Sequence, residues 1–148
     1  VLVLAIAGLI FLMVFIALPT LQRSQRDTQR KNDLGRVVSA VQSFKANNRG
    51  QAPRYGQYRD IILPTYLKSS GDDFKDPDGS SYRFNSDLAS IGTIPSLRKT
   101  DWSPFDTIIY VFFSAKCTSD GSNTVAANPN ETALMIVLES GGIYCANA

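Results

Sequence analysis

The chain begins with an uninterrupted apolar run. Residues 1–18 read VLVLAIAGLIFLMVFIAL and contain no charged or polar side chain. As a helix, this run would extend about 27 Å, close to the hydrocarbon thickness of a bilayer. A helix that is apolar on every face must be surrounded by lipid or by protein. We therefore expect residues 1–19 of the mature protein to form a helix half that spans a membrane or lies in the core of an assembly.

A proline ends this run, and the pattern then changes twice. Pro19 lacks an N–H and its ring clashes with the preceding turn, so it predicts a bend or a short unwound stretch near residues 15–18. Residues 20–33 (TLQRSQRDTQRKND) are polar almost all round. Apolar residues at spacings of three and four follow and predict a helical face that packs on a domain: Leu34, Val37, Val38, Val41 and Phe44. Residues 20–50 are therefore expected to be the docking half of one long helix, with Asn47, Asn48 and Gly50 as its C-terminal stop signals.

Residues 51–148 are expected to form a globular, β-rich head. Prolines and glycines punctuate its first half, with a short helical turn expected at residues 58–67. Four segments with alternating, β-branched or aromatic residues predict strands: 81–85, 107–117, 132–139 and 143–145. Strands joined by short turns favour an antiparallel sheet, whose apolar face the striped helix half would cover. The predicted fold class is α+β, with the helix packed on a small antiparallel sheet.

Charge divides the chain into a basic stem and a mildly acidic head. Residues 22–49 carry seven basic and two acidic side chains, a net charge of +5, whereas the rest of the chain has a net charge of −3. One interpretation is a helix face that is solvated all round. The other is electrostatic pairing between the stem of one copy and the head of another. The sequence leaves both open.

The chemistry-bearing residues are few. The two cysteines, Cys117 and Cys145, allow one disulfide, which would place the head outside the cytoplasm; two free thiols are the alternative. The chain contains no histidine, no Gly-rich phosphate loop and no nucleophile elbow. We therefore expect no enzymatic activity and no cofactor. A weak calcium candidate is the acidic cluster before Gly79, whose spacing differs from that of an EF-hand: Asp72, Asp73, Asp76 and Asp78.

Residues 1–44 resemble the N-terminal helix of type IV pilins and pseudopilins. An apolar span, a glycine (Gly8), a helix-bending proline and a polar, then amphipathic, continuation occur in that family's order. The segment Asp76-Pro77-Asp78-Gly79-Ser80-Ser81-Tyr82 is similar to the Asp-Pro-x-Gly-x-x-Tyr turn of several family members, and the C-terminal cysteine pair is like a pilin's disulfide-bounded loop. The family's cleavage-site glycine, followed by Phe-Thr-Leu-Ile-Glu, would lie just before Val1.

The resemblance implies a type IV pilin fold and a structural role. The chain would be a subunit of a type IV pilus that serves adhesion, surface motility or DNA uptake, and the compact head suits a major subunit. Before assembly it would be a single-pass protein of the cytoplasmic membrane with its head outside. In the cell-surface pilus, many copies would pack through a filament core that includes Leu2, Leu4, Ile6, Gly8, Phe11, Phe15 and Pro19.

The resemblance also implies partners and alternatives. An assembly platform and ATPases would act in trans, and the head could bind host or surface ligands, whereas nucleic acid is not expected as a direct partner of this chain. The second functional candidate is a pseudopilin of a type II secretion system or a competence pseudopilus. A third, an anchored enzyme or receptor, is disfavoured by the missing catalytic chemistry.

Overall fold

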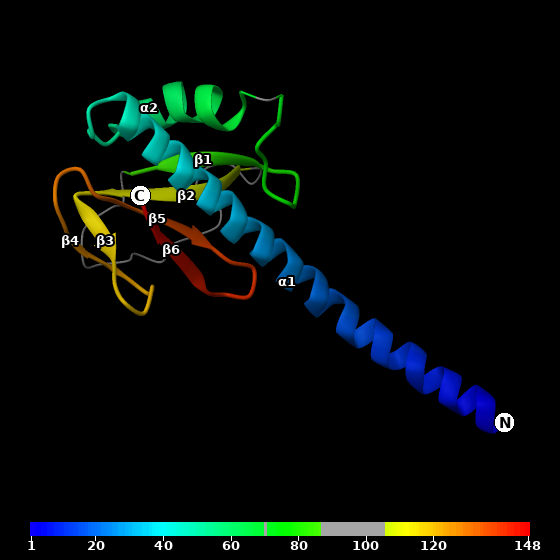
Figure 1. Cartoon of the computed structure of the whole chain (residues 1–148). Helices are drawn as coiled ribbons and strands as arrows, with labels where there is room; N and C mark the ends of the chain where they lie inside the picture. The colour runs from blue at the N-terminus through cyan, green and yellow to red at the C-terminus, as the bar shows by residue number, and fades with distance from the viewer. Residues whose placement is uncertain (70, 87–105) are drawn as a thin grey trace.

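A computed structural model of the chain describes residues 1–69, 71–86 and 106–148. The long helix α1 (Leu2–Asn47) lies across a sheet with its C-terminal half, and its N-terminal half extends far beyond the head (Figure 1). Two short helices, α2 (Tyr55–Gln57) and η1 (Tyr58–Leu67), follow α1 in the chain, and η1 packs beside it. The predicted α+β architecture is confirmed.

Helix α1 continues through Pro19 without interruption. The unwound stretch expected near residues 15–18 is absent. Proline removes a single helical hydrogen bond, that of its own missing N–H, while the turns on either side keep theirs. The predicted C-terminal stop is present, because Gly50 has a positive φ of 80° and its N–H donates to the Lys45 carbonyl at 2.8 Å.

Four strands form the main sheet, in the order β1-β2-β5-β6. Their bounds are Ser81–Asn85 for β1, Asp106–Phe113 for β2, Thr132–Val137 for β5 and Ile143–Asn147 for β6. The β2–β5 and β5–β6 pairs are antiparallel as expected, but β1 runs parallel to β2. The prediction of a purely antiparallel sheet is wrong at this edge. A parallel pair needs a connection of a dozen or more residues, and 20 residues separate β1 from β2.

The strand predicted over residues 107–117 is in fact two strands in different sheets. Ser114 adopts a left-handed backbone with φ of 51°, which ends the pairing of β2. The chain then enters β3 (Ala115–Cys117), which pairs with β4 (Thr124–Ala126) in a separate two-stranded sheet. A continuous run of β-forming residues could not reveal this turn.

Apolar side chains are buried on both faces of the main sheet. Between the sheet and α1, the core contains the helix stripe: Leu34, Val37, Val41 and Phe44 are buried, and Val38 is half-buried against them. Tyr58 and Ile62 of η1 complete this core. The opposite face carries Ile108, Tyr110 and Met135, next to the half-buried Cys117 and Cys145. Because β2 and β5 are buried on both faces, their sequences are apolar almost throughout.

The two cysteines form a disulfide that joins the small sheet to the main one. Cys117 of β3 is bonded to Cys145 of β6, and the backbone N–H of Cys117 also donates to the Asn147 side chain at 2.7 Å. Residues 117 and 145 lie 28 positions apart in the sequence. The bond therefore fastens the β3–β4 hairpin, which is otherwise at the periphery of the head (Figure 1).

Replacing both cysteines with serine should lower the free energy of unfolding of the head by roughly 3 to 4 kcal/mol, because a closed loop of this length restricts the unfolded chain. Urea unfolding of the full chain in a nonionic detergent measures this. A reducing agent should destabilise the unchanged protein equally and leave the double variant unaffected. Equal stability of the two proteins would show that the bond contributes nothing.

Candidate functional site

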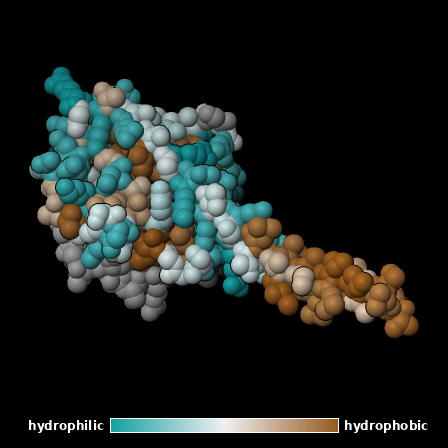
Figure 2. Space-filling view, turned by 60° about the horizontal axis from the view of Figure 1, so that its bottom comes forward, coloured by the Kyte–Doolittle hydropathy of each residue, from teal (hydrophilic) through white to brown (hydrophobic). Residues whose placement is uncertain are grey.

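The N-terminal half of α1 is a large apolar surface that no other described part of the chain covers. An 18-residue stretch has a mean hydropathy of 2.9 with none of it buried, so α1 is long and apolar enough to cross a membrane. Figure 2 shows this half as an almost entirely hydrophobic rod leaving a mostly hydrophilic head. Soluble monomers rarely expose a contiguous apolar surface of this extent. The rod must therefore be covered by lipid or by other protein.

The residues expected in a filament core all lie on this rod. The side chains of Leu2, Leu4, Ile6, Phe11 and Phe15 are exposed. Gly8 has open space around it, since an added Cβ would meet no atom within 4 Å. Any restriction on the size of residue 8 must therefore come from outside the chain.

Where the rod meets the head, α1 buries an arginine. Arg30 is completely inaccessible to solvent. It lies in the polar stretch of the stem, where most other residues are exposed. Its Nε donates to Oδ1 of Asp76 and its Nη2 to Oδ2, each at 2.7 Å. This bidentate geometry is the strongest arrangement of an arginine and a carboxylate. Thr107 of β2 donates a further hydrogen bond to Asp76 at 2.7 Å.

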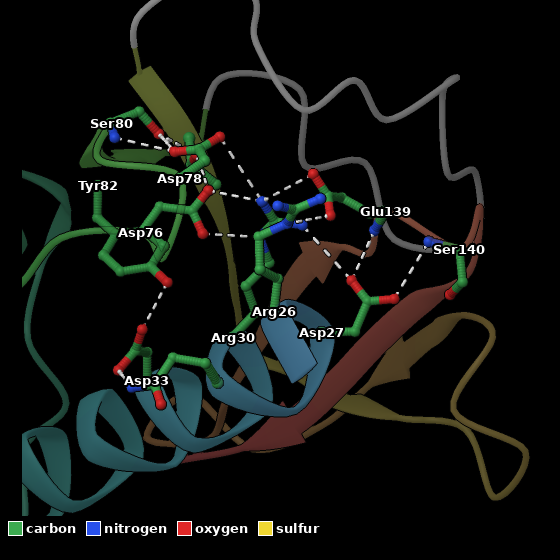
Figure 3. A network of polar contacts seen from close by, with 12 residues as sticks. Arg26, Asp27, Arg30, Asp33, Asp76, Asp78, Ser80, Tyr82, Glu139 and Ser140 are labelled. Carbon is green, nitrogen blue, oxygen red and sulfur yellow. Dashed lines mark hydrogen bonds and ion pairs between the residues drawn. The ribbon is translucent and has the colours of Figure 1, made fainter. Parts of the chain in front are cut away.

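Three more carboxylates surround the same guanidinium (Figure 3). Its nitrogens lie 3.4 Å from Asp27, 3.7 Å from Asp78 and 3.8 Å from Glu139. Arg26 adds a second cation through an ion pair of 2.7 Å with Glu139. The pKa of Arg30 is raised, because the carboxylates, Asp76 first, outweigh the opposing effect of burial. We call Arg26, Asp27, Arg30, Asp76, Asp78 and Glu139 the junction cluster.

Asp27 attaches the helix to the turn between β5 and β6. Its two carboxylate oxygens accept the backbone N–H groups of Glu139 at 2.7 Å and Ser140 at 3.1 Å. Burial alone would raise the pKa of Asp27, but these hydrogen bonds and the charge of Arg30 together lower it below the ordinary value. Asp27 is therefore held in its charged form.

Asp33, six residues further along α1 than Asp27, has a pKa that is shifted in the opposite direction. The Tyr82 hydroxyl donates to its Oδ2 at 2.7 Å and Gln29 to its Oδ1 at 3.2 Å. Burial dominates nevertheless and raises the pKa of Asp33, while the Tyr82 pKa is raised by burial and by the neighbouring carboxylate. Tyr82 thus fixes β1 to the helix through a carboxylate that is easier to protonate than usual.

The sequence interpretation of a solvated stem is wrong on this face. Asp27, Arg30 and Asp33 are buried, and the acidic head pairs with the stem of its own chain. A signal was present in the spacing, because residues 27 and 30 continue the alternating three- and four-residue spacing of the stripe at 34, 37, 41 and 44. Pairing between copies stays a prediction.

The four carboxylates of the calcium candidate do not converge on one point. Asp76 and Asp78 face Arg30, Asp72 pairs with Arg36, and Asp73 pairs with Lys75 at 2.9 Å. Within residues 1–69, 71–86 and 106–148, no group of three or more acidic or cysteine side chains is arranged to hold a metal ion. The acidic cluster in the sequence neutralises cations of the protein itself.

No protein-family model, curated protein or solved structure matches this chain.

Replacing Arg30 with methionine should destabilise the chain by about 3 to 5 kcal/mol, because Asp76 and its neighbours would be left buried without a counter-charge. The loss of stability in Arg30→Lys should be smaller than in Arg30→Met but still present, since lysine keeps the charge and loses the bidentate geometry. Urea unfolding in nonionic detergent measures both. The matched control is Arg23→Met, an exposed arginine two turns earlier, which should change little. Equal stability of the Arg30→Met and Arg23→Met proteins would contradict this role of Arg30.

Replacing Asp27 with asparagine should lower the free energy of unfolding by about 2 kcal/mol at pH 7, since hydrogen bonds to charged groups contribute roughly 1.5 to 3 kcal/mol to stability. A carboxylate whose folded pKa lies below its unfolded value stabilises the fold above the unfolded pKa, and this is lost as the pH falls through the folded pKa. The difference from the unchanged protein should therefore shrink below about pH 4. Asp33→Asn, at a site with a raised pKa, should cost less at pH 7. A pH-independent cost of Asp27→Asn would refute the assignment.

Proposed function

We propose that this chain is a structural subunit of a type IV pilus filament. One observation carries the proposal: a single unbroken helix is exposed and apolar over its first 18 residues and is fixed to a disulfide-bonded head over its second half. A helix of this kind needs lipid around it as a single subunit and other copies around it in an assembly. The resemblance of residues 1–44 to the pilin helix supports the same conclusion.

The attachment of helix to head supports a structural role. The junction cluster ties α1 both to the loop that carries Asp76 and to the β5–β6 turn. With its helix held this firmly, each head would take a fixed orientation relative to the packed rods of a filament. Contacts between different surfaces of identical copies build an open helical filament when their rotation does not close into a ring, and this is the arrangement that we propose.

Transfer from lipid to protein changes the hydrophobic contribution little, because lipid tails and apolar side chains are alike. Packing geometry must then select the filament arrangement. Gly8 is the one position in residues 1–18 that has no side chain, and in the isolated chain nothing lies close to it. We assign Gly8 to a close approach between helices of neighbouring copies.

Gly8→Leu should abolish filaments while leaving membrane insertion unchanged, because leucine adds bulk at the close approach and makes the span more apolar. Negative-stain microscopy of sheared surface material, with the chain identified by mass spectrometry, tests both the function and the residue. Gly35→Leu is the control, since Gly35 is also an exposed helical glycine with open space around it. Normal filaments from Gly8→Leu would show that no close approach occurs there.

The same microscopy of sheared surface material distinguishes a pilus subunit from the second candidate, a pseudopilin. Absence of long filaments from the unchanged chain, together with a protein-secretion defect on its deletion, would reject the pilus subunit in favour of a pseudopilin.

A further inference from the structure

A groove lies directly above the apolar rod, between α1 and the β5–β6 turn. It has a volume of about 340 Å³. Its lining combines apolar surface, including that of Leu138, with two cations and four hydroxyl groups: Arg23, Lys31, Thr20, Ser24, Thr28 and Ser140. The groove is separate from the interior of the junction cluster, although Asp27 contributes to its wall.

The cations of this groove are available to a ligand. Arg23 is exposed, and it makes no ion pair in the part of the chain that the structure describes. The Lys31 ammonium lies 5.6 Å from the centre of the Tyr144 ring and makes no hydrogen bond or ion pair with residues 1–69, 71–86 or 106–148. The carboxylate of Asp27 is occupied by Arg30 and by two backbone N–H groups. The groove therefore favours an anion.

The position of the groove along α1 indicates which anion. The apolar run ends at Leu18, and Arg23 follows about 7.5 Å further along the helix axis. The headgroup region on each side of a bilayer is roughly 5 to 8 Å thick. Arg23 would thus lie at the level of the lipid phosphates. The backbone of Lys31 lies further along α1 from the apolar run than that of Arg23. Because helical side chains lean toward the N-terminus, the Lys31 side chain lines the same groove as Thr20.

We propose that this groove binds the phosphate of an anionic membrane phospholipid before assembly. Arg23 and Lys31 supply the charge, and the hydroxyls of Thr20 and Ser24 supply hydrogen bonds. The inference rests on the membrane stage of the proposed function. It also gives the basic residues that follow the span a partner on the outer side of the membrane. The lipid would have to leave when the helix enters a filament.

The test uses the full chain in detergent micelles doped with phosphatidylglycerol or phosphatidylcholine, with bound lipids counted by native mass spectrometry. The unchanged chain should retain phosphatidylglycerol preferentially. Arg23→Gln combined with Lys31→Gln should reduce that preference by about fivefold for each cation removed, since a surface cation contributes about 1 kcal/mol toward anionic lipid.

The matched control removes the same charge elsewhere, by combining Lys68→Gln with Lys116→Gln at two exposed positions of the head. This control should keep the preference of the unchanged chain. An equal loss in both double variants, or no loss in either, overturns the lipid site. Vesicles of phosphatidylcholine alone give the second readout: failure of the unchanged chain to insert there overturns the membrane stage itself, whereas insertion without lipid preference overturns only the groove.

Discussion

A guanidinium without access to water must be neutralised where it lies, and Arg30 imposes this condition on the junction of helix and head. Asp76, Asp78 and Glu139 reach it from segments far apart in the sequence. Bringing them together requires the loop before β1 and the turn after β5 to stand at fixed positions along α1. In many proteins, replacing a buried ionic cluster by well-packed apolar side chains leaves the stability of the fold unchanged or increases it. What the ionic version adds is a register, because only one axial position of the helix places Arg30 opposite Asp76.

The two ends of α1 invert the usual relation between polarity and burial. Its most apolar residues are exposed and several of its most polar ones are buried. The inversion is stable because each part has a different partner. The head provides carboxylates and backbone N–H groups for the polar turns around Arg30, and the stripe from Leu34 to Phe44 fills the core. The rod has no partner among the described residues of the chain, so its environment must come from lipid or from other protein.

Much of this fold could be predicted from the sequence, since it depends on local periodicity. The stripe beginning at Leu34, the stop at Gly50 and most strand segments follow from spacing and composition. The parallel pairing of β1, the turn at Ser114 and the partners of Arg30 depend on which distant segments meet, and the spacing of residues along one segment does not specify them. For the site, the sequence identified the apolar rod but missed the junction cluster. Only the continuation of the stripe through residues 30 and 27 indicated that a polar face was turned inward.

Charge segregation between stem and head now has a definite physical meaning. Among the residues that the structure describes, three of the seven cations between residues 22 and 49 form ion pairs with the head: Arg26 with Glu139, Arg30 with Asp76 and Arg36 with Asp72. These three pairs use three of the eleven acidic side chains outside the stem, so only part of the opposite charge is neutralised in this way. Arg23 and Lys31 line the groove beside the end of the apolar run. If the proposed membrane stage holds, lipid phosphates would lie next to these two cations. An electrostatic contact between neighbouring subunits through this part of the stem would then have to compete with lipid.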